Sequence, residues 1–340
     1  MSVTRRTILA GTALAITPSF GETALAQSSP AAPSPAAPSP AAANPAGQSP
    51  STPQAPGFYR YKVGDIEVTA VNDGFARRPV DGLIRNAPIE DVRQAMAEAF
   101  LPDDILPITF TGLVLRQGDR LTVIDTGNGE FGGPTSGNWL KNFRAAGFDP
   151  AAVTSVVISH FHGDHINGLR AKDGTAIFPK AEVMVPEAEW AFWMDDSRMN
   201  QAPEGMKGAF QSVRRVFGPI AADVKRYAWD KEIVPGLTSV NAAGHTPGHT
   251  AYMLSSAGGR LMILSDVTNH PALFVRHPDW AAVFDMDPDQ ARQTRLRMLD
   301  MAAAERAQVA FYHAPFPASG HIARDSGGFR FAPIQWMPVV

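Results

Sequence analysis

Residues 159–168 read SHFHGDHING and place three histidines and one aspartate within six positions. Histidine is otherwise scarce, with 9 in the 340 residues of the chain. His160 and His162 are two residues apart, so in an extended backbone their side chains leave the same face of the chain. The glycine that follows lets the backbone bend, so that Asp164 and His165 can point into a neighbouring volume. A solvated surface loop is the alternative, but so many imidazole and carboxylate groups in one short motif favour a metal site.

Further candidate ligands lie where other predicted strands end. The turn GHTPGHT carries His245 and His249, the apolar run LMILSD ends in Asp266, and AFYH ends in His313. A carboxylate at the end of a buried strand is costly unless it is paired or binds a cation. Each of these residues alone could be a hydrogen-bonded polar group of the core, and one of the two turn histidines is expected to have a purely conformational role. Together with the first motif they exceed the four ligands of a single tetrahedral zinc ion, which indicates two metal ions.

The composition restricts the chemistry of the site and the class of partner. The chain contains no cysteine, so nitrogen and oxygen atoms must hold any metal, and zinc, manganese, cobalt or iron suit such a donor set. With 44% hydrophobic and 19% charged residues, the chain can bury one large core or two fused layers. The formal net charge of −3 argues against a nucleic-acid partner, which would favour a basic surface.

Residues 1–26 are predicted to be an export signal. Arg5 and Arg6 precede a short apolar run at residues 8–16, and a small-residue cleavage site ends at Ala26. The apolar run is too short for a membrane span, which takes about 20 residues in a helix, so no membrane insertion is expected. An amphipathic helix is the alternative, but the segment has no polar stripe. The paired arginines resemble the twin-arginine export motif, which predicts a periplasmic or secreted protein.

Residues 27–56 contain nine prolines and no large apolar residue. Such a segment cannot bury enough surface to offset its ordering entropy, so a disordered linker is predicted. The folded domain is therefore expected at residues 57–340.

Predicted strands and helices follow one another through this domain. Hairpins are expected at residues 58–74 and 108–127, with turns at Gly64–Asp65 and Gly118–Asp119. Helices are expected at residues 88–99, 136–150, 187–196 and 287–305, and single strands at residues 153–160, 181–186, 237–244, 250–256, 260–266 and 307–313. The segment around Gly205 and Gly208 is expected to be mobile. Strands in runs with helices between them predict two sheets face to face under helical layers.

The order of the motifs HFHGDH, GHTPGHT, LSD and FYH resembles the metallo-β-lactamase superfamily, over essentially all of residues 57–340. The resemblance implies an α+β fold, a four-layer αββα sandwich. It also implies the following metal ligands: His160, His162 and His249 for one ion, Asp164, His165 and His313 for the second, and Asp266 between them. Asp125 of the DTG motif and His245 would then orient these ligands from outside.

Within the superfamily, the sequence is most similar to methyl parathion hydrolase and its lactonase-like relatives. This similarity implies a hydrolase with two divalent ions, zinc first among them, that cleaves a small neutral ester, lactone or organophosphate triester. A metal-bridging hydroxide would attack, and Asp164 would take the released proton. By position, the substrate pocket would be lined by Phe131, Trp193, Phe210, Asn269 and His270. For the aromatic residues, plain core packing is the alternative.

Two positions narrow the expected substrate. The main class of zinc β-lactamases carries a cysteine where Asp266 stands, so antibiotic hydrolysis is disfavoured. Acyl-homoserine lactonases carry a tyrosine where Asn269 stands, which disfavours a quorum-signal lactonase in particular. The remaining alternatives are a persulfide dioxygenase-like enzyme with a single iron, a nuclease of the same superfamily, and a non-catalytic binding module stabilised by metal. A homodimer is compatible with the sequence.

Overall fold

The computed structural model describes residues 57–340. The predicted export signal (residues 1–26) and the predicted linker (residues 27–56) lie outside the described residues, so both stay predictions. Within residues 57–340 the chain forms two sheets of seven strands each, and none of the helices there is long and apolar enough to cross a membrane.

The first sheet contains strands β1 to β7 in sequence order. These are β1 (Phe58–Val63), β2 (Ile66–Pro79), β3 (Ile105–Gln117), β4 (Arg120–Ile124), β5 (Ser155–Val157), β6 (Glu182–Pro186) and β7 (Lys225–Tyr227). Pairing is antiparallel from β1 to β4 and parallel from β4 to β7. The carboxyl ends of β4, β5 and β6 therefore lie at the same edge of the sheet.

The second sheet contains strands β8 to β14, again in sequence order. These are β8 (Glu232–Val234), β9 (Leu237–Asn241), β10 (Thr250–Ser256), β11 (Gly259–Ile263), β12 (Gln308–Ala310), β13 (Ser319–Asp325) and β14 (Gly328–Pro333). Only β11 and β12 pair in parallel, so their carboxyl ends also share one edge.

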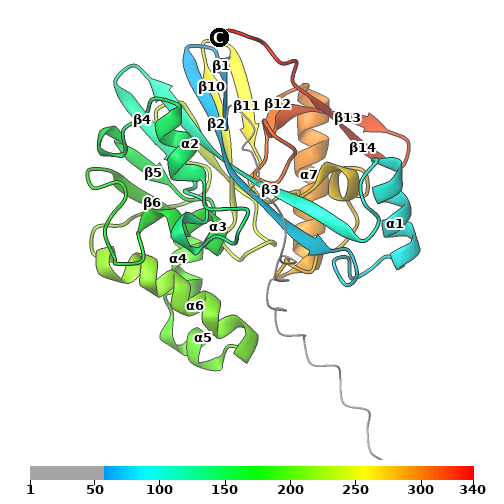
Figure 1. Cartoon of the computed structure of the whole chain (residues 1–340), viewed down its shortest axis with the longest axis horizontal. Helices are drawn as coiled ribbons and strands as arrows, with labels where there is room; N and C mark the ends of the chain where they lie inside the picture. The colour runs from blue at the N-terminus through cyan, green and yellow to red at the C-terminus, as the bar shows by residue number, and fades with distance from the viewer. Residues whose placement is uncertain (1–56) are drawn as a thin grey trace, which may run out of the picture. The chain divides into compact units, whose positions relative to one another are not determined.

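Helices cover the outer faces of the two sheets (Figure 1). The helices are α1 (Ile89–Glu98), α2 (Trp139–Ala145), α3 (Gly163–Ile166), α4 (Glu187–Trp193), α5 (Asp196–Gln201), α6 (Glu204–Phe217) and α7 (Pro288–Glu305). Short 3-10 turns lie at Gly129–Phe131, Pro150–Ala152, Asn167–Leu169 and Gly218–Ile220, and a π-helical turn at Pro271–Val275. In Figure 1, α2, α4 and α6 lie beside the first sheet and α7 beside the second.

Buried apolar residues fill the space on both sides of each sheet. One cluster lies between the sheets and includes Val68, Leu113 and Leu254. A second cluster lies under α2 and α6, and a third lies under α7. The result is helix, sheet, sheet, helix, which confirms the predicted four-layer α+β sandwich.

A bulge in β2 fixes the loop that follows β4. The pairing of β2 with β3 shifts between Asn72 and Gly74, and Asp73 lies at the irregularity. The buried carboxylate of Asp73 accepts hydrogen bonds from the backbone N–H of Asn128 at 2.8 Å and of Trp139 at 2.7 Å. The loop beyond β4 is therefore tied to the sheet near the predicted site.

Most predicted elements are present, but several are shorter than expected. The hairpin turns at Gly64 and Gly118 are confirmed, with φ of 56° and 57° that favour glycine. The strand expected at residues 153–160 ends at Val157, because the backbone leaves the sheet before the first candidate ligand. The strand expected at residues 260–266 likewise ends at Ile263.

The segment expected to be mobile is helical instead. Gly205 and Gly208 both lie in α6, whose buried side chains include Phe210, Val213 and Phe217. The spacing of these residues gives α6 one apolar face, and packing of that face against the first sheet outweighs the weak helix propensity of two glycines.

Candidate metal centre

The candidate ligands lie where central strands of both sheets end. His160 follows β5, Asp266 follows β11, and His313 follows β12. Loops at the carboxyl ends of parallel strands leave a sheet at one edge, and here the edges of the two sheets meet. Residues more than 150 positions apart are thus brought together on a rigid scaffold.

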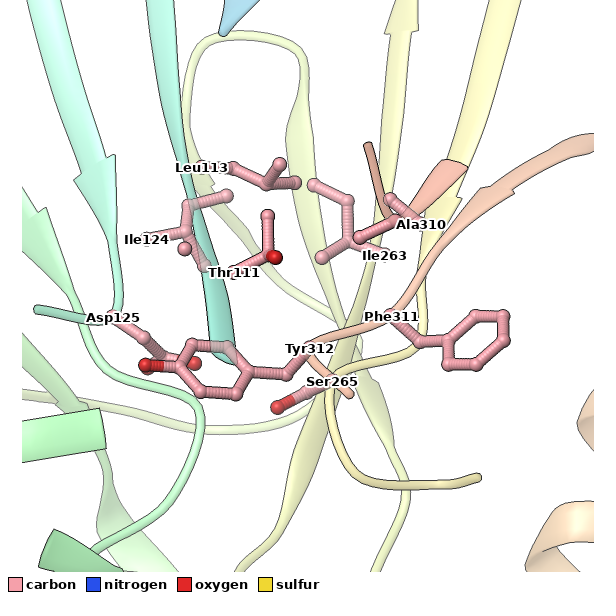
Figure 2. Close-up of a pocket in the computed structure, with 11 residues that line it drawn as sticks. Thr111, Leu113, Ile124, Asp125, Ile263, Ser265, Ala310, Phe311 and Tyr312 are labelled. Atoms are coloured by element: carbon pink, nitrogen blue, oxygen red, sulfur yellow. The ribbon is translucent and has the colours of Figure 1, made fainter. Parts of the chain in front are cut away.

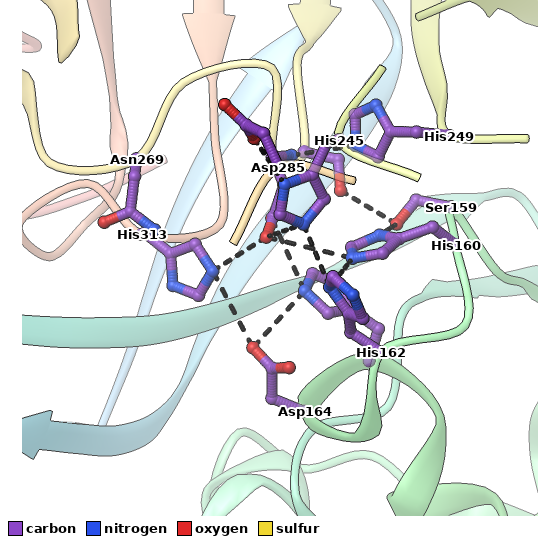
Figure 3. A network of polar contacts seen from close by, with 12 residues as sticks. Ser159, His160, His162, Asp164, His245, His249, Asn269, Asp285 and His313 are labelled. Atoms are coloured by element: carbon purple, nitrogen blue, oxygen red, sulfur yellow. Dashed lines mark hydrogen bonds and ion pairs between the residues drawn. The ribbon is translucent and has the colours of Figure 1, made fainter. Parts of the chain in front are cut away.

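The first group consists of His160, His162, His245 and Asp266, whose ligand atoms all lie within 4.8 Å of one another. His162 Nδ1 lies 3.1 Å from His160 Nε2 and 2.9 Å from His245 Nε2. Asp266 Oδ2 lies 3.8 Å from His160 Nε2 and 3.4 Å from His245 Nε2. Figure 3 shows the three imidazole rings pointing toward one another.

The second group consists of Asp164, His165 and His313. Asp164 Oδ2 lies 3.4 Å from His165 Nε2 and 3.7 Å from His313 Nε2. Asp266 also reaches this group, since its Oδ1 lies 3.4 Å from His165 Nε2 and its Oδ2 lies 2.9 Å from His313 Nε2. The carboxylate of Asp266 therefore lies between the two groups.

Divalent cations fit both groups. Atoms bound about 2.0–2.2 Å from a tetrahedral ion lie roughly 3.3–3.6 Å apart. The separations given above run from 2.9 to 3.8 Å, and all ligand atoms within each group lie within 4.8 Å of one another. His165 Nε2 and Asp266 Oδ1 are buried, and neither has a hydrogen-bond partner within residues 57–340. A cation between these two atoms would satisfy both. Imidazole and carboxylate without thiolate form a donor set that zinc and similar divalent ions accept.

The imidazoles differ in their affinity for protons. Burial, and then the neighbouring imidazoles, lower the pKa of His162 to about 3 and the pKa of His160 well below its ordinary value. These two rings are therefore neutral at pH 7 and keep lone pairs for a metal ion. Burial also opposes the charged forms of His165 and His313, but nearby carboxylates, Asp266 foremost, outweigh it and raise the pKa of both.

The turn between β9 and β10 corrects one expectation. The resemblance assigns His249 to the first metal ion and a supporting role to His245, and the geometry reverses these roles. His249 Nδ1 lies 3.0 Å from the carbonyl oxygen of Ala242, and its Nε2 accepts a hydrogen bond from the backbone N–H of Asp266 at 3.1 Å. Both nitrogens of His249 are engaged by backbone groups, whereas Nε2 of His245 points to the ligand atoms of the first group (Figure 3).

Asp125, at the end of β4, lies where the resemblance expects a supporting carboxylate. It accepts hydrogen bonds from the backbone N–H of Ser159 at 2.8 Å and from Ser159 Oγ at 2.7 Å. Its Oδ2 also lies 2.8 Å from His165 Nδ1. A ring N–H directed at a carboxylate leaves the other ring nitrogen as the metal ligand, so Asp125 orients His165.

Asp285 and Arg295 support His245, and the sequence reasoning missed both. Asp285 Oδ1 lies 2.9 Å from His245 Nδ1, and Arg295 Nη2 donates a hydrogen bond to Asp285 Oδ2 at 3.1 Å. Arg295 is buried and also donates to the carbonyl oxygens of Val267 and Trp280, which fixes the pair. The one signal in the sequence is a charged residue, Arg295, on a face of the helix predicted at residues 287–305 that otherwise carries apolar residues and Thr294.

Glu189 joins two loops that carry ligands, and it was also missed. Its side chain is buried. Its Oε1 accepts hydrogen bonds from the backbone N–H of Phe161 at 3.0 Å and from Trp193 Nε1 at 2.9 Å, and its Oε2 accepts one from the backbone N–H of Gly248 at 2.7 Å. Burial raises the pKa of Glu189, although these N–H groups oppose the shift. Phe161 lies between two ligand histidines and Gly248 lies in the turn after His245, so Glu189 holds the two loops together.

A cavity of about 500 Å³ opens over both groups. Apart from members of the two groups, its lining residues are Ala76, Arg78, Ile108, Phe110, Asn128, Gly163, Asn167, Ala209, Asn269 and Phe284. This volume suits a small organic ligand, and the apolar walls with few polar groups are typical of a binding pocket.

Two aromatic residues expected to line this cavity lie in the core instead. Trp193 and Phe210 are each 1% exposed, and their ring centroids lie 4.8 Å apart. Trp193 lies in α4 and Phe210 in α6, each on the buried face of its helix. These faces pack into the core, so neither side chain reaches the cavity. Their assignment to the substrate pocket is therefore wrong.

Phe131 and His270 are also absent from the lining of this cavity, whereas Asn269 belongs to it. The ring of Phe131 lies 3.8 Å from the guanidinium carbon of Arg215, and this stacking holds it at the surface. His270 Nδ1 accepts a hydrogen bond from the backbone N–H of Ala272 and begins the π-helical turn.

A second cavity, of about 10 Å³, lies between the sheets beside Asp125 (Figure 2). Thr111, Ser265 and Tyr312 are the hydroxyl-bearing residues that line it. It has room for about one water molecule and none for a substrate. The larger cavity is therefore the candidate substrate site.

The chain is similar to known proteins in sequence. The family model described as the metallo-beta-lactamase superfamily matches residues 109–313. An N-acyl homoserine lactonase from a Bacillus species is 22% identical over 171 residues, which is 50% of this chain and 59% of the relative. The chain thus spans about three-fifths of the length of this curated relative.

Solved structures extend the similarity to the fold. AidC, a dizinc quorum-quenching lactonase in complex with a product, is 26% identical, with a TM-score of 0.78 over 83% of this chain and 98% of that chain. The hydrolase AbOPH, of the beta lactamase superfamily, is 28% identical, with a TM-score of 0.79 over 84% and 100%. The family match covers 109–313, a span that contains every residue of both ligand groups, and the chain belongs to the metallo-beta-lactamase superfamily.

Proposed function

We propose that the protein is a hydrolase that uses two divalent metal ions, zinc first among them, to cleave a small carboxylic ester or lactone. The observation that carries the proposal is a pair of ligand groups that share Asp266 beneath a cavity with apolar walls. The lactonases among the similar proteins support an ester or lactone bond as the one that is cleaved.

In this proposal each group would hold one ion, with Asp266 in contact with both. The ligands would be His160, His162 and His245 for one ion and Asp164, His165 and His313 for the other. Bound ions would lower the pKa of a water molecule toward neutrality and polarise the carbonyl group of the substrate. No serine or cysteine nucleophile is then required.

Asp164 is the residue placed to accept the proton that hydrolysis releases. Burial opposes its ionisation, but His165 and then His313 lower the pKa of Asp164, so its carboxylate is charged. Its side chain lines the cavity and stays 22% exposed. Tyr312 donates a hydrogen bond from its hydroxyl group to the carbonyl oxygen of Asp164 at 2.5 Å, which holds the residue in position.

Asn269 is placed to bind an oxygen atom of the substrate. Its side-chain oxygen accepts a hydrogen bond from the backbone N–H of His270 at 2.9 Å, which leaves the NH₂ group to donate to a ligand in the cavity. Ile108, Phe110 and Phe284 would pack against the apolar part of an acyl or alkoxy group. An amide at the position of Asn269 favours esters and lactones other than the quorum-signal lactones.

Elemental analysis of the purified protein, combined with a substrate panel, tests the proposal. The panel contains aryl esters, simple lactones, N-acyl homoserine lactones and organophosphate triesters. We expect two equivalents of divalent metal and turnover of an ester or lactone in the wild-type protein. Asp266→Ala should lose both the full metal content and the turnover, and His162→Ala should lose the turnover. Full metal loading without turnover of any substrate would favour the metal-stabilised binding module, and a single iron would favour the dioxygenase. Hydrolysis of triesters alone would support the resemblance to methyl parathion hydrolase.

We also propose that residues 1–26 export the protein by the twin-arginine route to the periplasm or beyond. Support comes from Arg5 and Arg6 before the short apolar run. Replacement of both arginines by lysine should retain the protein in the cytoplasm. A mature protein that still begins at Met1 would contradict the proposal.

A further inference from the structure

Among the residues that the structure describes, Arg78 is the one arginine or lysine that lines the large cavity. The other charged or ionisable groups in the lining belong to the two ligand groups, and the remaining polar side chains are amides. Outside the two ligand groups, Arg78 is therefore the one charged side chain among the described residues that line this cavity. Such a charge acts over a longer distance than it would in bulk water, because the surrounding protein has a lower dielectric constant.

Strand pairing fixes the backbone of Arg78, whereas its guanidinium group is open to a ligand. Arg78 pairs with Leu106 in the β2–β3 ladder, and Leu106 is fully buried. Among the described residues, no carboxylate forms an ion pair with Arg78 and no side-chain hydrogen bond engages it. The side chain is exposed, so a ligand can reach it.

The neighbouring Arg77 differs from Arg78 in the direction of its side chain. Successive residues of a strand point to opposite faces, and Ala76 and Arg78 share the face that lines the cavity. Arg77 lies on the other face, where its guanidinium carbon is 5.7 Å from the centre of the Phe75 ring. The two arginines have the same charge and similar exposure, which makes Arg77 a matched control.

The strand register sets the distance between Arg78 and the candidate metal centre. Phe75 pairs with Thr109, whose carbonyl oxygen lies 2.9 Å from His313 Nδ1. Arg78 is three residues further along β2, which corresponds to roughly 10 Å at about 3.4 Å per residue. A flexible chain of about eight carbon atoms can connect a bond cleaved at the centre to a group beside Arg78.

From these observations we propose that Arg78 determines substrate specificity, and that the preferred substrates carry a carboxylate remote from the ester or lactone bond. This inference rests on the proposed hydrolase function and departs from the expectation of a wholly neutral substrate. The carboxylate would pair with the guanidinium group of Arg78, and the apolar walls would contact the chain between the two ends of the substrate.

Two substrates that differ only in the remote charge test the inference. These are 4-nitrophenyl octanoate and the mono-4-nitrophenyl ester of octanedioic acid. In the wild-type protein we expect kcat/KM to be about fivefold higher for the charged ester. Arg78→Leu should bring the ratio to about one, Arg78→Lys should keep part of the preference, and Arg77→Leu should keep the wild-type ratio. The preference should also weaken at high salt.

Equilibrium binding separates this inference from the proposed function. The anilides of octanoic acid and of octanedioic acid (the latter as its monoanilide) resist hydrolysis, and calorimetry gives their Kd without turnover. We expect the Kd of the charged anilide to be about fivefold lower than that of the neutral one in the wild type. The variants should change this ratio in the same order as in the kinetic experiment. Equal ratios in the wild type and Arg78→Leu, in kinetics or in binding, overturn the role of Arg78. Absence of turnover of both esters by metal-loaded protein overturns the proposed function, and the anilides still decide the inference.

Discussion

His245 and His249 lie four residues apart in one turn and have different tasks. Each ring uses Nδ1 for a support, Asp285 for His245 and the carbonyl oxygen of Ala242 for His249. What separates them is the partner of Nε2, which is another imidazole for His245 and a backbone N–H for His249. A nitrogen that already accepts a hydrogen bond from the backbone is not available to a cation.

The two histidines should therefore respond differently to substitution. We expect His245→Ala to lose about one equivalent of bound metal and to lower kcat/KM roughly 100-fold or more, because a ligand is removed. His249→Gln should keep its metal content but lower the free energy of unfolding by roughly 1–3 kcal/mol, because one amide group cannot replace both ring nitrogens and leaves either the N–H of Asp266 or the carbonyl oxygen of Ala242 without a partner. Elemental analysis and urea unfolding measure both effects. Loss of metal in His249→Gln with full loading in His245→Ala would restore the assignment made from the sequence.

Glu189 offers a test of a support that touches no ligand side chain. In Glu189→Gln, one oxygen can still accept from Phe161 and Trp193, but an NH₂ group then faces the backbone N–H of Gly248. We expect a loss of roughly 1–3 kcal/mol in the free energy of unfolding, the cost of a buried donor without a partner. Glu187→Gln, on the exposed first turn of the same helix, should change it by less than about 0.5 kcal/mol. Equal stability of the two variants would contradict the role of Glu189.

For single residues, the sequence predicts which side chains are candidate ligands better than it predicts which groups they contact. His160, His162, Asp164 and His165 could be proposed because they are close together in the chain. The choice between His245 and His249 rested on the resemblance alone and went to His249, since both occur in the same turn with the same neighbours. The partners of Glu189 and Asp285 lie up to 59 residues away, and no local pattern encodes such contacts.

The positions at which the strands end determine where the candidate ligands lie. The apolar runs before His160, Asp266 and His313 predicted buried strands, and strands are present there, but each ends three residues earlier than predicted. Apolar side chains continue past the last ladder hydrogen bond because the loops themselves are buried. The sequence therefore predicted which residues are buried, but not the residue at which the hydrogen bonds between strands end.

Helix α6 was not predicted, because two glycines interrupt its sequence. No neighbouring atom lies within 4 Å of a Cβ built at Gly205 or Gly208. We therefore expect Gly205→Ala and Gly208→Ala each to raise the free energy of unfolding by about 0.5–1 kcal/mol, through reduced entropy of the unfolded chain. Thermal unfolding monitored by circular dichroism measures the change. Destabilisation by either variant would show that α6 must bend at these positions.

Unlike Gly205 and Gly208, Gly248 has no space for a Cβ atom, because it lies at the contact between α4 and the turn that carries His245. A Cβ at this position would lie 2.1 Å from the backbone nitrogen of Glu189. Backbone atoms cannot move aside as a side chain does, so we expect Gly248→Ala to lower the free energy of unfolding by about 1–3 kcal/mol. The same unfolding experiment applies, and a neutral effect would mean that α4 and the turn can separate without cost.

For the molecule as a whole, the two sheets share one polar centre at their common edge. His160, His162, Asp164 and His165 come from the first sheet, whereas His245, Asp266 and His313 come from the second. The order of motifs along the chain predicted this sandwich through resemblance to a known family. Periodicity alone predicted two sheets and helical layers but not the strand order, because pairing between distant strands depends on contacts that no local pattern specifies.

Cations bound at this centre would connect the two sheets, and their removal should weaken the whole domain. A ligand present at a thousand times its Kd stabilises the folded state by about 4 kcal/mol, which corresponds to a shift in Tm of roughly 10 °C for a domain of this size. We expect a chelator to lower Tm by about this amount in a single transition, and added zinc to restore it.

Matched variants make this test specific to the shared carboxylate. Asp266→Ala should abolish most of the chelator-induced shift in Tm, because neither group is complete without this residue. His321→Ala, an exposed position on β13 away from both groups, should keep the full shift. A wild-type Tm that stays constant, while elemental analysis shows that the metal has been removed, would mean that the sheets hold together without the cations. The centre would then serve chemistry alone, with Asp125, Glu189 and Asp285 sufficient to keep the ligands in place.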